Sequence, residues 1–322
     1  MTAFGYTLMS EEHGPRELVG IARRAEDLGF DFLVSSDHYH PWVPEQQHSP
    51  YAWSVLGAVA AVTERIELAT MVTCPTIRYH PAIVAQKAAT LGLLSEGRFT
   101  LGLGAGERLN EHVVGRGWPP ADVRHEMLAE AIEIIQLLWQ GGYQSYRGEY
   151  FTLEDARVFD LPDRPVPIGV AASGPESATL AAEYGDVLIA TEPELSIVEA
   201  FTAAGGDAAR TWSQIPVCWG EDAGKALELA HQQFRWSALG WKVQAELPNP
   251  VNFDAAAAQV RPEDLRGSIP VGPDPQAYVD AVRSFTDAGF GRIAFVQVGP
   301  DQEGFFRFWR DELQGALGGS TG

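Results

Sequence analysis

An acid, two imidazoles and an indole follow one apolar run of this 322-residue chain. Asp37, His38, His40 and Trp42 come directly after residues 30–35, which have the composition of a buried strand. The ends of parallel strands are where α/β proteins place catalytic groups. An imidazole titrates near pH ~6.5 and can move a proton at neutral pH, a carboxylate can orient it, and an indole offers a flat apolar wall. The segment therefore predicts proton transfer beside a planar ligand.

The spacing of His38 and His40 also permits a metal site, because residues two apart on a strand face the same way. Paired histidines of this kind hold the metal in metal-dependent barrel hydrolases. Such a site needs further ligands after later strands, and residues 167–174 and 187–191 supply none before Glu192. We therefore expect no bound metal and keep the hydrolase as an alternative. Either histidine can also simply satisfy a turn, which is the better interpretation of His40.

Alternating glycines mark a second segment. Gly102, Gly104 and Gly106 precede Glu107, and without side chains the backbone there can approach a flat ligand closely. A tight turn is the structural alternative. The spacing does not match the dinucleotide-binding fingerprint, and no ribose-binding acid follows at a suitable distance. Alone, the segment leaves both interpretations open.

Two further segments have the form of ligand-binding turns. Small residues at 171–175 lead from a predicted strand into a helix, whose free N–H groups can hold a phosphate. An ordinary strand-to-helix turn is the alternative. In residues 70–81 a strand ends early against Pro75 and Pro81 and can bulge beneath a ring.

The elements that must position these residues alternate between short apolar runs and amphipathic segments, which is the pattern of repeated βα units. We predict eight strands: Phe4–Leu8, Asp31–Ser35, Ile66–Val72, Phe99–Leu103, Val166–Ala171, Val187–Ala190, Ile215–Cys218 and Arg292–Val296. We predict helices at Pro15–Leu28, Tyr51–Thr63, Pro81–Leu94, Ala121–Trp139, Glu176–Tyr184 and Pro275–Ala288. The pattern predicts an α/β fold, the (β/α)8 TIM barrel.

Two insertions interrupt the alternation. Residues 143–153 have the pattern of a hairpin, and residues 235–272 are too long for an ordinary connection, so we expect a substrate lid there. We predict one barrel domain over residues 1–314 and a flexible tail at 315–322.

Composition narrows the partners. With 23 basic and 43 acidic residues the formal charge is -20, which disfavours nucleic acid and anionic lipid as partners and leaves a small-molecule substrate. No apolar run approaches the ~18 to 20 residues of a membrane helix. The chain moves from Met1 into a strand without a signal-peptide pattern, and Cys74 and Cys218 suit a reducing environment. We expect a cytoplasmic protein.

Taken together, these segments resemble the luciferase-like flavin and deazaflavin superfamily, and within it the F420-dependent glucose-6-phosphate dehydrogenases and their relatives. The resemblance runs from about Phe4 to Leu313. It rests on residues 15–19, Ser36-Asp37-His38 with Pro41-Trp42, Pro75-Thr76 with Arg78-Tyr79, Gly106-Glu107 with Leu109-Asn110-Glu111, and Ala171-Ala172 with Gly174-Pro175.

The resemblance implies a barrel homodimer that binds the deazaflavin F420 and passes a hydride between ring carbon C5 and a carbinol carbon of the substrate. It implies that His38 is the base for the hydroxyl proton, Glu107 the acid serving the reduced ring, and Trp42 and Glu11 substrate-side residues. Met71 and Val72 fall where relatives have a non-prolyl cis peptide beneath the ring. The implied cofactor contacts are Asp37, Met71, Val72, Thr76, Gly106, Asn110, Ala171, Ala172, Ser173 and Gly174, with the F420 phosphate at 172–174.

One departure bears on the substrate. The sugar-phosphate enzymes hold the phosphate with lysines and an arginine, whereas the expected lysine is replaced around Glu194 and the arginine position falls at Ser268. Lys242, Arg261 or Arg266 can substitute. We expect an alcohol or sugar, without strong dependence on a phosphate, in either direction of reaction. An FMN-dependent monooxygenase of the same superfamily is the alternative, against which the pairing of Glu107 with Trp42 argues.

Overall fold

Eight parallel strands close into a barrel, as the sequence predicts, in the order β1-β10-β9-β8-β7-β4-β3-β2. This computed structural model describes residues 2–319. The barrel strands are β1 (Ala3–Thr7), β2 (Phe32–Ser35), β3 (Glu67–Thr70), β4 (Phe99–Leu103), β7 (Ile168–Ala171), β8 (Val187–Ile189), β9 (Thr211–Val217) and β10 (Arg292–Gln297). Because all eight are parallel, their carboxyl ends meet at one mouth.

Helices surround the barrel. They are α1 (Pro15–Asp27), α2 (Ala52–Val62), α3 (Pro81–Leu94), α4 (Arg108–Glu111), α5 (Ala121–Trp139), α6 (Pro175–Tyr184), α7 (Leu195–Ala203), α8 (Ala223–Phe234), α9 (Trp241–Gln244), α10 (Pro250–Ala256), α11 (Pro275–Asp287), α12 (Gln302–Phe308) and α13 (Gln314–Gly319). Proline occupies the first turn of α1, α3, α6, α10 and α11, where its missing N–H has no intrahelical partner to lose.

The core has two layers because successive strand residues point to opposite faces. The inward faces form a cluster inside the barrel that includes Phe32, Met71 and Trp212. The outward faces pack against the helices in a larger cluster. Arg292 lies over the Phe32 and Trp212 rings and pairs with Glu67 at 2.8 Å, at the amino ends of the strands. The residues that follow the strands lie at the opposite, carboxyl end of the barrel.

Close strand packing depends on Gly102 in β4. A Cβ there would lie 1.9 Å from the backbone oxygen of Thr70 in β3. We expect Gly102→Ala to lower the free energy of unfolding by about 2–4 kcal/mol in urea titrations, since backbone cannot yield as a flexible side chain does. Gly20→Ala in α1, with nothing within 4 Å of the added Cβ, is the control and should stabilise by about 0.5–1 kcal/mol. An unchanged midpoint in Gly102→Ala would contradict this packing.

The structure also differs from the prediction in places. β9 begins at Thr211, four residues before the predicted Ile215. The prediction missed the first half of this strand because polar residues there flank the inward-pointing Trp212. Helices α4, α7, α8, α9, α10, α12 and α13 were not predicted. Part of the predicted tail is helical: α13 covers Gln314–Gly319 and buries Leu317, while residues 320–322 lie outside the described part.

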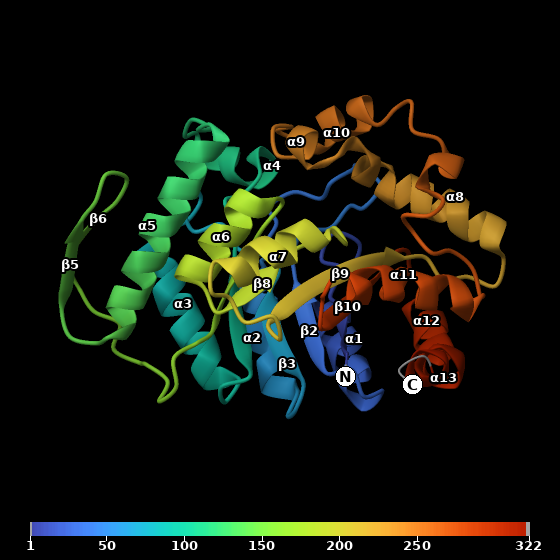
Figure 1. Cartoon of the computed structure of the whole chain (residues 1–322), viewed down its shortest axis with the longest axis horizontal. Helices are drawn as coiled ribbons and strands as arrows, with labels where there is room; N and C mark the ends of the chain where they lie inside the picture. The colour runs from blue at the N-terminus through green and yellow to red at the C-terminus, as the bar shows by residue number, and fades with distance from the viewer. Residues whose placement is uncertain (1, 320–322) are drawn as a thin grey trace.

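The two insertions take different forms. The predicted hairpin forms from β5 (Gln144–Arg147) and β6 (Thr152–Ala156) and projects from one side of the barrel (Figure 1). The segment 235–272 contains α9 and α10 and lies on the same side of the barrel as α4 (Figure 1). The Arg108 N–H donates to the Ala245 carbonyl at 3.0 Å, so the insertion contacts the loop after β4. Among the described helices, none is long and apolar enough to cross a membrane.

Candidate active site

The imidazole of His38 lies between two carboxylates. Its Nδ1 is 2.6 Å from Oε1 of Glu11, and its Nε2 is 3.5 Å from Oε1 of Glu107. The Glu11 contact has the length but not the alignment of a hydrogen bond, so it is a close ion pair. The three side chains follow β2, β1 and β4, which are far apart in sequence and share one mouth of the barrel. The barrel therefore assembles a Glu–His–Glu array.

The contact between Glu11 and His38 favours the charged form of both groups. Burial alone would neutralise both groups. The Glu11 charge nevertheless overcomes the desolvation of His38 and raises its pKa, with a further contribution from Glu107. Conversely, burial opposes the Glu11 charge, but His38 and the Ser36 hydroxyl, which donates at 2.7 Å, lower its pKa. The site therefore favours the imidazolium form of His38, which can donate a proton and must lose one before it can accept.

Asp37 is held by donors from the chain itself. Its Oδ2 accepts from Nε1 of Trp53 and Oγ1 of Thr73, both at 2.9 Å. Its Oδ1 accepts from the Tyr79 hydroxyl at 3.2 Å and lies 3.2 Å from Nη2 of Arg78. The carboxylate therefore fixes the turn that precedes His38, and its contact with a cofactor stays a prediction.

Asn110 joins the two loops that carry His38 and Glu107. Its Oδ1 accepts from the backbone N–H groups of Tyr39 at 2.6 Å and His40 at 3.0 Å, and its Nδ2 donates to Oε1 of Glu107. The same Glu107 oxygen lies nearest to His38. Asn110 therefore orients the carboxylate that faces the imidazole.

Trp42 forms the aromatic side of the site. Its ring meets the His38 ring edge-on at a centroid distance of 5.0 Å. On another side it stacks with Trp236 at 4.1 Å and 11° between planes, and it contacts Phe253 at 5.2 Å. Trp236 and Phe253 both belong to the insertion. The insertion therefore packs directly against Trp42, the aromatic side chain beside His38.

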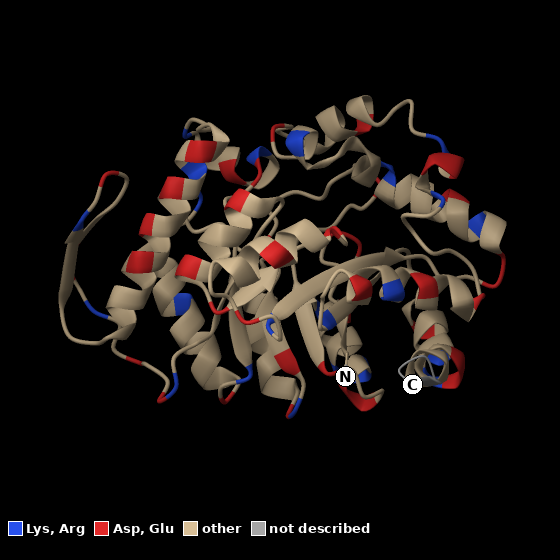
Figure 2. Ribbon diagram, viewed as in Figure 1, with Lys and Arg blue, Asp and Glu red and all other residues tan. Residues whose placement is uncertain are grey.

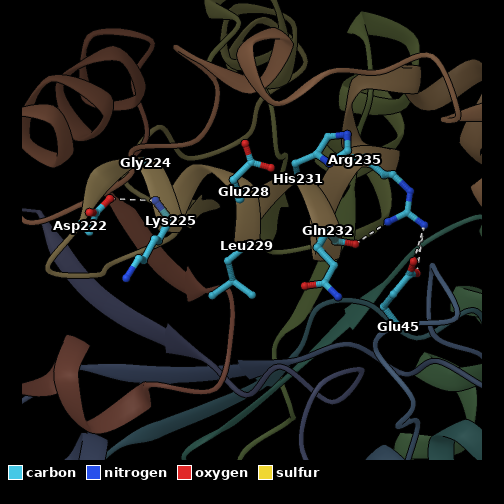
Figure 3. A pocket seen from close by; sticks show the side chains of 9 residues that line it. All are labelled: Glu45, Asp222, Gly224, Lys225, Glu228, Leu229, His231, Gln232 and Arg235. Atoms are coloured by element: carbon cyan, nitrogen blue, oxygen red, sulfur yellow. Dashed lines mark hydrogen bonds and ion pairs between the residues drawn. The ribbon is translucent and has the colours of Figure 1, made fainter.

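An ion-pair cluster anchors this insertion. Arg235, at the end of α8, lies 2.9 Å from Oε1 of Glu45 (Figure 3). It also lies 2.7 Å from Oδ1 of Asp254. Glu45 belongs to the loop that carries Trp42. The Gln46 side chain of that loop accepts from the Trp42 N–H at 2.8 Å and donates to the Gln233 carbonyl at 3.1 Å. The insertion and the Trp42 loop thus form one packed unit.

A cleft of about 950 Å³ runs along α8 at this anchor, and Figure 3 shows its lining. The lining mixes acids such as Asp222 and Glu228 with Lys225 and Arg235. None of its lining residues belongs to the His38 array, so we do not place the chemistry there. Acidic residues are spread over many helices and loops of the described chain (Figure 2), so charge alone does not mark a site.

The predicted floor of the cofactor site has the expected backbone form. The peptide bond between Met71 and Val72 is cis, as the resemblance implies. Beside it, a Cβ on Gly104 would lie 2.7 Å from the Val72 side chain, and Gly106 has a φ of 81°. Glycine is therefore required at 106 by conformation and at 104 by close approach. Thr76, also predicted here, is buried with its hydroxyl 3.2 Å from the Cys74 sulfur.

The predicted phosphate turn suits an anion. Ala171, Ala172 and Ser173 follow β7, and Gly174 is the N-cap of the ten-residue α6, with open space around it and no side-chain cap. The Ser173 N–H donates to the Ser177 hydroxyl at 3.1 Å. The first-turn N–H groups of α6 have no intrahelical acceptors, and they favour a phosphate. The residues present therefore fit the phosphate of a cofactor that lies across this mouth.

The two histidines of the metal alternative have different partners. The Nδ1 of His40 lies 3.0 Å from the Leu109 carbonyl, and its ring stacks beside that of His112. Within residues 2–319 no three His, Cys, Asp or Glu side chains gather as metal ligands would.

Two buried charges near His38 were not assigned a role from the sequence. Arg78 contacts Asp37 and Glu111, and burial raises the pKa of Glu111 to about 7 despite the nearby guanidinium. The position of Glu111, four residues after Glu107 on a short helix, was the available signal. For Arg78 the sequence offered only its place in a motif.

Comparison with known proteins finds relatives of one kind along nearly the whole chain. A family model described as luciferase-like monooxygenase matches residues 1–292. The F420-dependent glucose-6-phosphate dehydrogenase of Microbacterium testaceum is 36% identical over 324 positions, covering 96% of each chain. The enzyme of the same description from Intrasporangium calvum is 35% identical and covers 99% of this chain and 100% of its own.

Solved structures of similar fold include two enzymes described as F420-dependent. An F420-dependent secondary alcohol dehydrogenase in complex with an F420-acetone adduct superposes with a TM-score of 0.90 at 29% identity, covering 98% of this chain and 99% of that one. A coenzyme F420-dependent tetrahydromethanopterin reductase from Methanopyrus kandleri shares the fold, with a TM-score of 0.79 at 22% identity and coverages of 98% and 99%. The match over most of the chain, and full-length relatives at this identity, establish that the protein belongs to the luciferase-like monooxygenase family.

Proposed function

We propose that this protein is an F420-dependent oxidoreductase that interconverts an uncharged alcohol and the corresponding carbonyl compound. The observation that carries the proposal is the Glu11–His38–Glu107 array beside Trp42. The relatives named for F420 support the choice of cofactor.

The residues of the chain supply proton transfer and orientation. F420, when bound, would accept or donate a hydride at ring carbon C5. His38 takes the hydroxyl proton in the direction of oxidation and returns it in the direction of reduction. Glu11 holds the imidazole through Nδ1, which leaves Nε2 for the substrate side. Glu107, oriented by Asn110, faces the same nitrogen and is the acid we assign to the cofactor side.

Charge near His38 favours an uncharged substrate. The two acidic side chains Glu11 and Glu107 lie nearest to His38, and the nearby Arg78 is already paired with Asp37 and Glu111. Arg261, one candidate phosphate ligand, is exposed and paired with Asp264 at 2.7 Å. Lys242 and Arg266 are exposed. A carboxylate about 4 Å from a phosphate repels it by ~1–4 kcal/mol, depending on the effective dielectric.

We therefore expect secondary alcohols such as 2-propanol to exceed glucose 6-phosphate by at least about tenfold in kcat/KM, because each ~1.4 kcal/mol of differential binding is a factor of ten. The measurement is F420 reduction with each substrate at saturating cofactor. Unphosphorylated glucose is the matched control, since it separates the effect of the phosphate from that of the sugar. Faster turnover of glucose 6-phosphate than of both neutral substrates would contradict this assignment.

The cofactor is tested separately by titrating the purified protein with F420 and with FMN. We expect saturable binding of F420, and with reduced FMN no oxygen consumption above the background at which free reduced FMN reacts with oxygen. Binding of FMN alone, with substrate-dependent oxygen uptake above that background, would instead favour the monooxygenase suggested by the family name. The homodimer implied by the resemblance stays a prediction, to be checked by light scattering against the chain mass of 35.0 kDa.

A further inference from the structure

Arg78 connects the two halves of the His38–Glu107 array. It lies between β3 and α3, and its side chain is 7% exposed. Its Nη2 is 3.2 Å from Oδ1 of Asp37 and also donates to the Asp37 backbone carbonyl. Its Nε is 3.4 Å from Oε1 of Glu111, and its backbone N–H donates to Oε2 of Glu111 at 2.7 Å. One buried residue therefore holds both the turn after β2 and the helix after β4.

Each of these contacts holds a group that is directly linked to a residue of the Glu–His–Glu array. The Asp37 carbonyl belongs to the peptide group that links Asp37 to His38, so Nη2 fixes the start of His38. Glu111 is the last residue of α4, and Glu107 is its N-cap. Because Arg78 holds Glu111, it also orients this one-turn helix and the Glu107 residue that caps it.

The arrangement needs the forked shape of an arginine. The guanidinium presents planar N–H donors in fixed directions, whereas an ammonium is a compact point charge. Here Nη2 and Nε serve different carboxylates that come from different loops. A lysine at this position can supply the charge, but it cannot hold both partners at once.

Arg78 also acts on His38 through its charge. The charged groups that affect His38 are Glu11 from the loop after β1, Glu107 from the loop after β4 and Arg78 from the loop after β3. The two carboxylates raise the pKa of His38, and Arg78 opposes them. Position and charge are therefore separable effects of one side chain.

We propose that Arg78 is a positioning residue, which sets the separation of His38 and Glu107 by holding Asp37 and Glu111 at the same time. The inference rests on the proposed function for the reaction that His38 serves. It deepens that function by naming the residue that aligns the two proton-handling groups.

The test compares Arg78→Met and Arg78→Lys with the wild type. In both variants we expect kcat to fall about 10- to 10²-fold, as a misplacement near 1 Å can cause, with KM for the alcohol changed less than about threefold. NMR titration of His38 without cofactor gives a second readout. Arg78→Met should raise the pKa of His38, because an opposing positive charge is lost, while Arg78→Lys should leave it near the wild-type value.

The matched control is Arg292→Met, which removes a different arginine–carboxylate pair, with Glu67, at the other end of the barrel. It should alter the thermal midpoint without changing kcat or the His38 titration. If Arg78→Met does not fold, Arg78→Lys decides. Wild-type kcat in Arg78→Lys would overturn the proposal, as would an unchanged His38 pKa in a folded Arg78→Met. If the wild type shows no F420-dependent turnover, the proposed function fails, and the NMR titration of the variants alone decides the role of Arg78.

Discussion

His38→Ala should lower kcat by about 10²- to 10⁴-fold in both directions, the usual range for removal of a general acid–base group. The reason is geometric as well as chemical, since His38 lies between Glu11 and Glu107 and, within residues 2–319, no other imidazole pairs with either carboxylate. F420 binding should change less than about threefold, because the predicted phosphate turn at 172–174 lies on a different loop. Stopped-flow measurement of the hydride step with 2-propanol and acetone checks the loss.

His125→Ala, a change of the same kind on α5, is the control and should retain wild-type kcat. Thermal unfolding of His38→Ala should accompany the assay, because Glu11 loses its counter-charge and would take up a proton at higher pH. Full activity in a folded His38→Ala protein would remove His38 as the proton-transfer group. Loss of F420 binding together with activity would reassign it to the cofactor site.

Glu11→Gln should shift the pH dependence of turnover toward lower pH. His38 has a raised pKa because the Glu11 charge outweighs desolvation. Oxidation requires the neutral imidazole, so its rate rises as pH increases through that pKa, whereas reduction requires the imidazolium and falls over the same interval. Removing the Glu11 charge lowers the pKa of His38, so the pH dependence of both the oxidation rate and the reduction rate moves to lower pH. We also expect kcat at its own optimum to fall roughly 10- to 10²-fold, because the imidazole loses its orienting partner.

The pH profiles of kcat for oxidation and reduction measure this shift. Glu12→Gln is a neighbouring control: burial raises the pKa of Glu12 to about 8, so this side chain is largely protonated at neutral pH, and its replacement should leave the midpoint of the profile in place. A profile for Glu11→Gln that moved toward higher pH, or did not move, would contradict the ion pair with His38.

The strands could be predicted because most are short apolar runs between turn residues, which is how a sheet covered on both faces is encoded. β9 was only half recognised, since Thr211, Ser213 and Gln214 interrupt its apolar pattern although the strand is largely buried. The signal for α8 was present but not used: Asp222 caps it, and Ala226, Ala230 and Phe234 recur at spacings of four.

The meeting of His38 with Glu107 could be anticipated from the rule that strand ends share one mouth. The contact of Glu11 with Nδ1 could not, because it depends on how the loop after β1 turns back over β2. The bridge made by Arg78 was equally hidden, since residues 71–80 have no regular periodicity and their course is set by packing against both neighbouring loops.

The stacking of Trp42 on Trp236 has a consequence for how this protein can change over generations. The insertion contacts Trp42 beside His38 through aromatic rings and an arginine anchor, whereas the strand ends of the barrel supply Glu11, His38 and Glu107. If these three residues act as we propose, substitutions at 236 or 253 can alter which compounds are accepted while the proposed proton-transfer groups are inherited intact. Divergence of new specificities in descendants of this gene should concentrate in that segment.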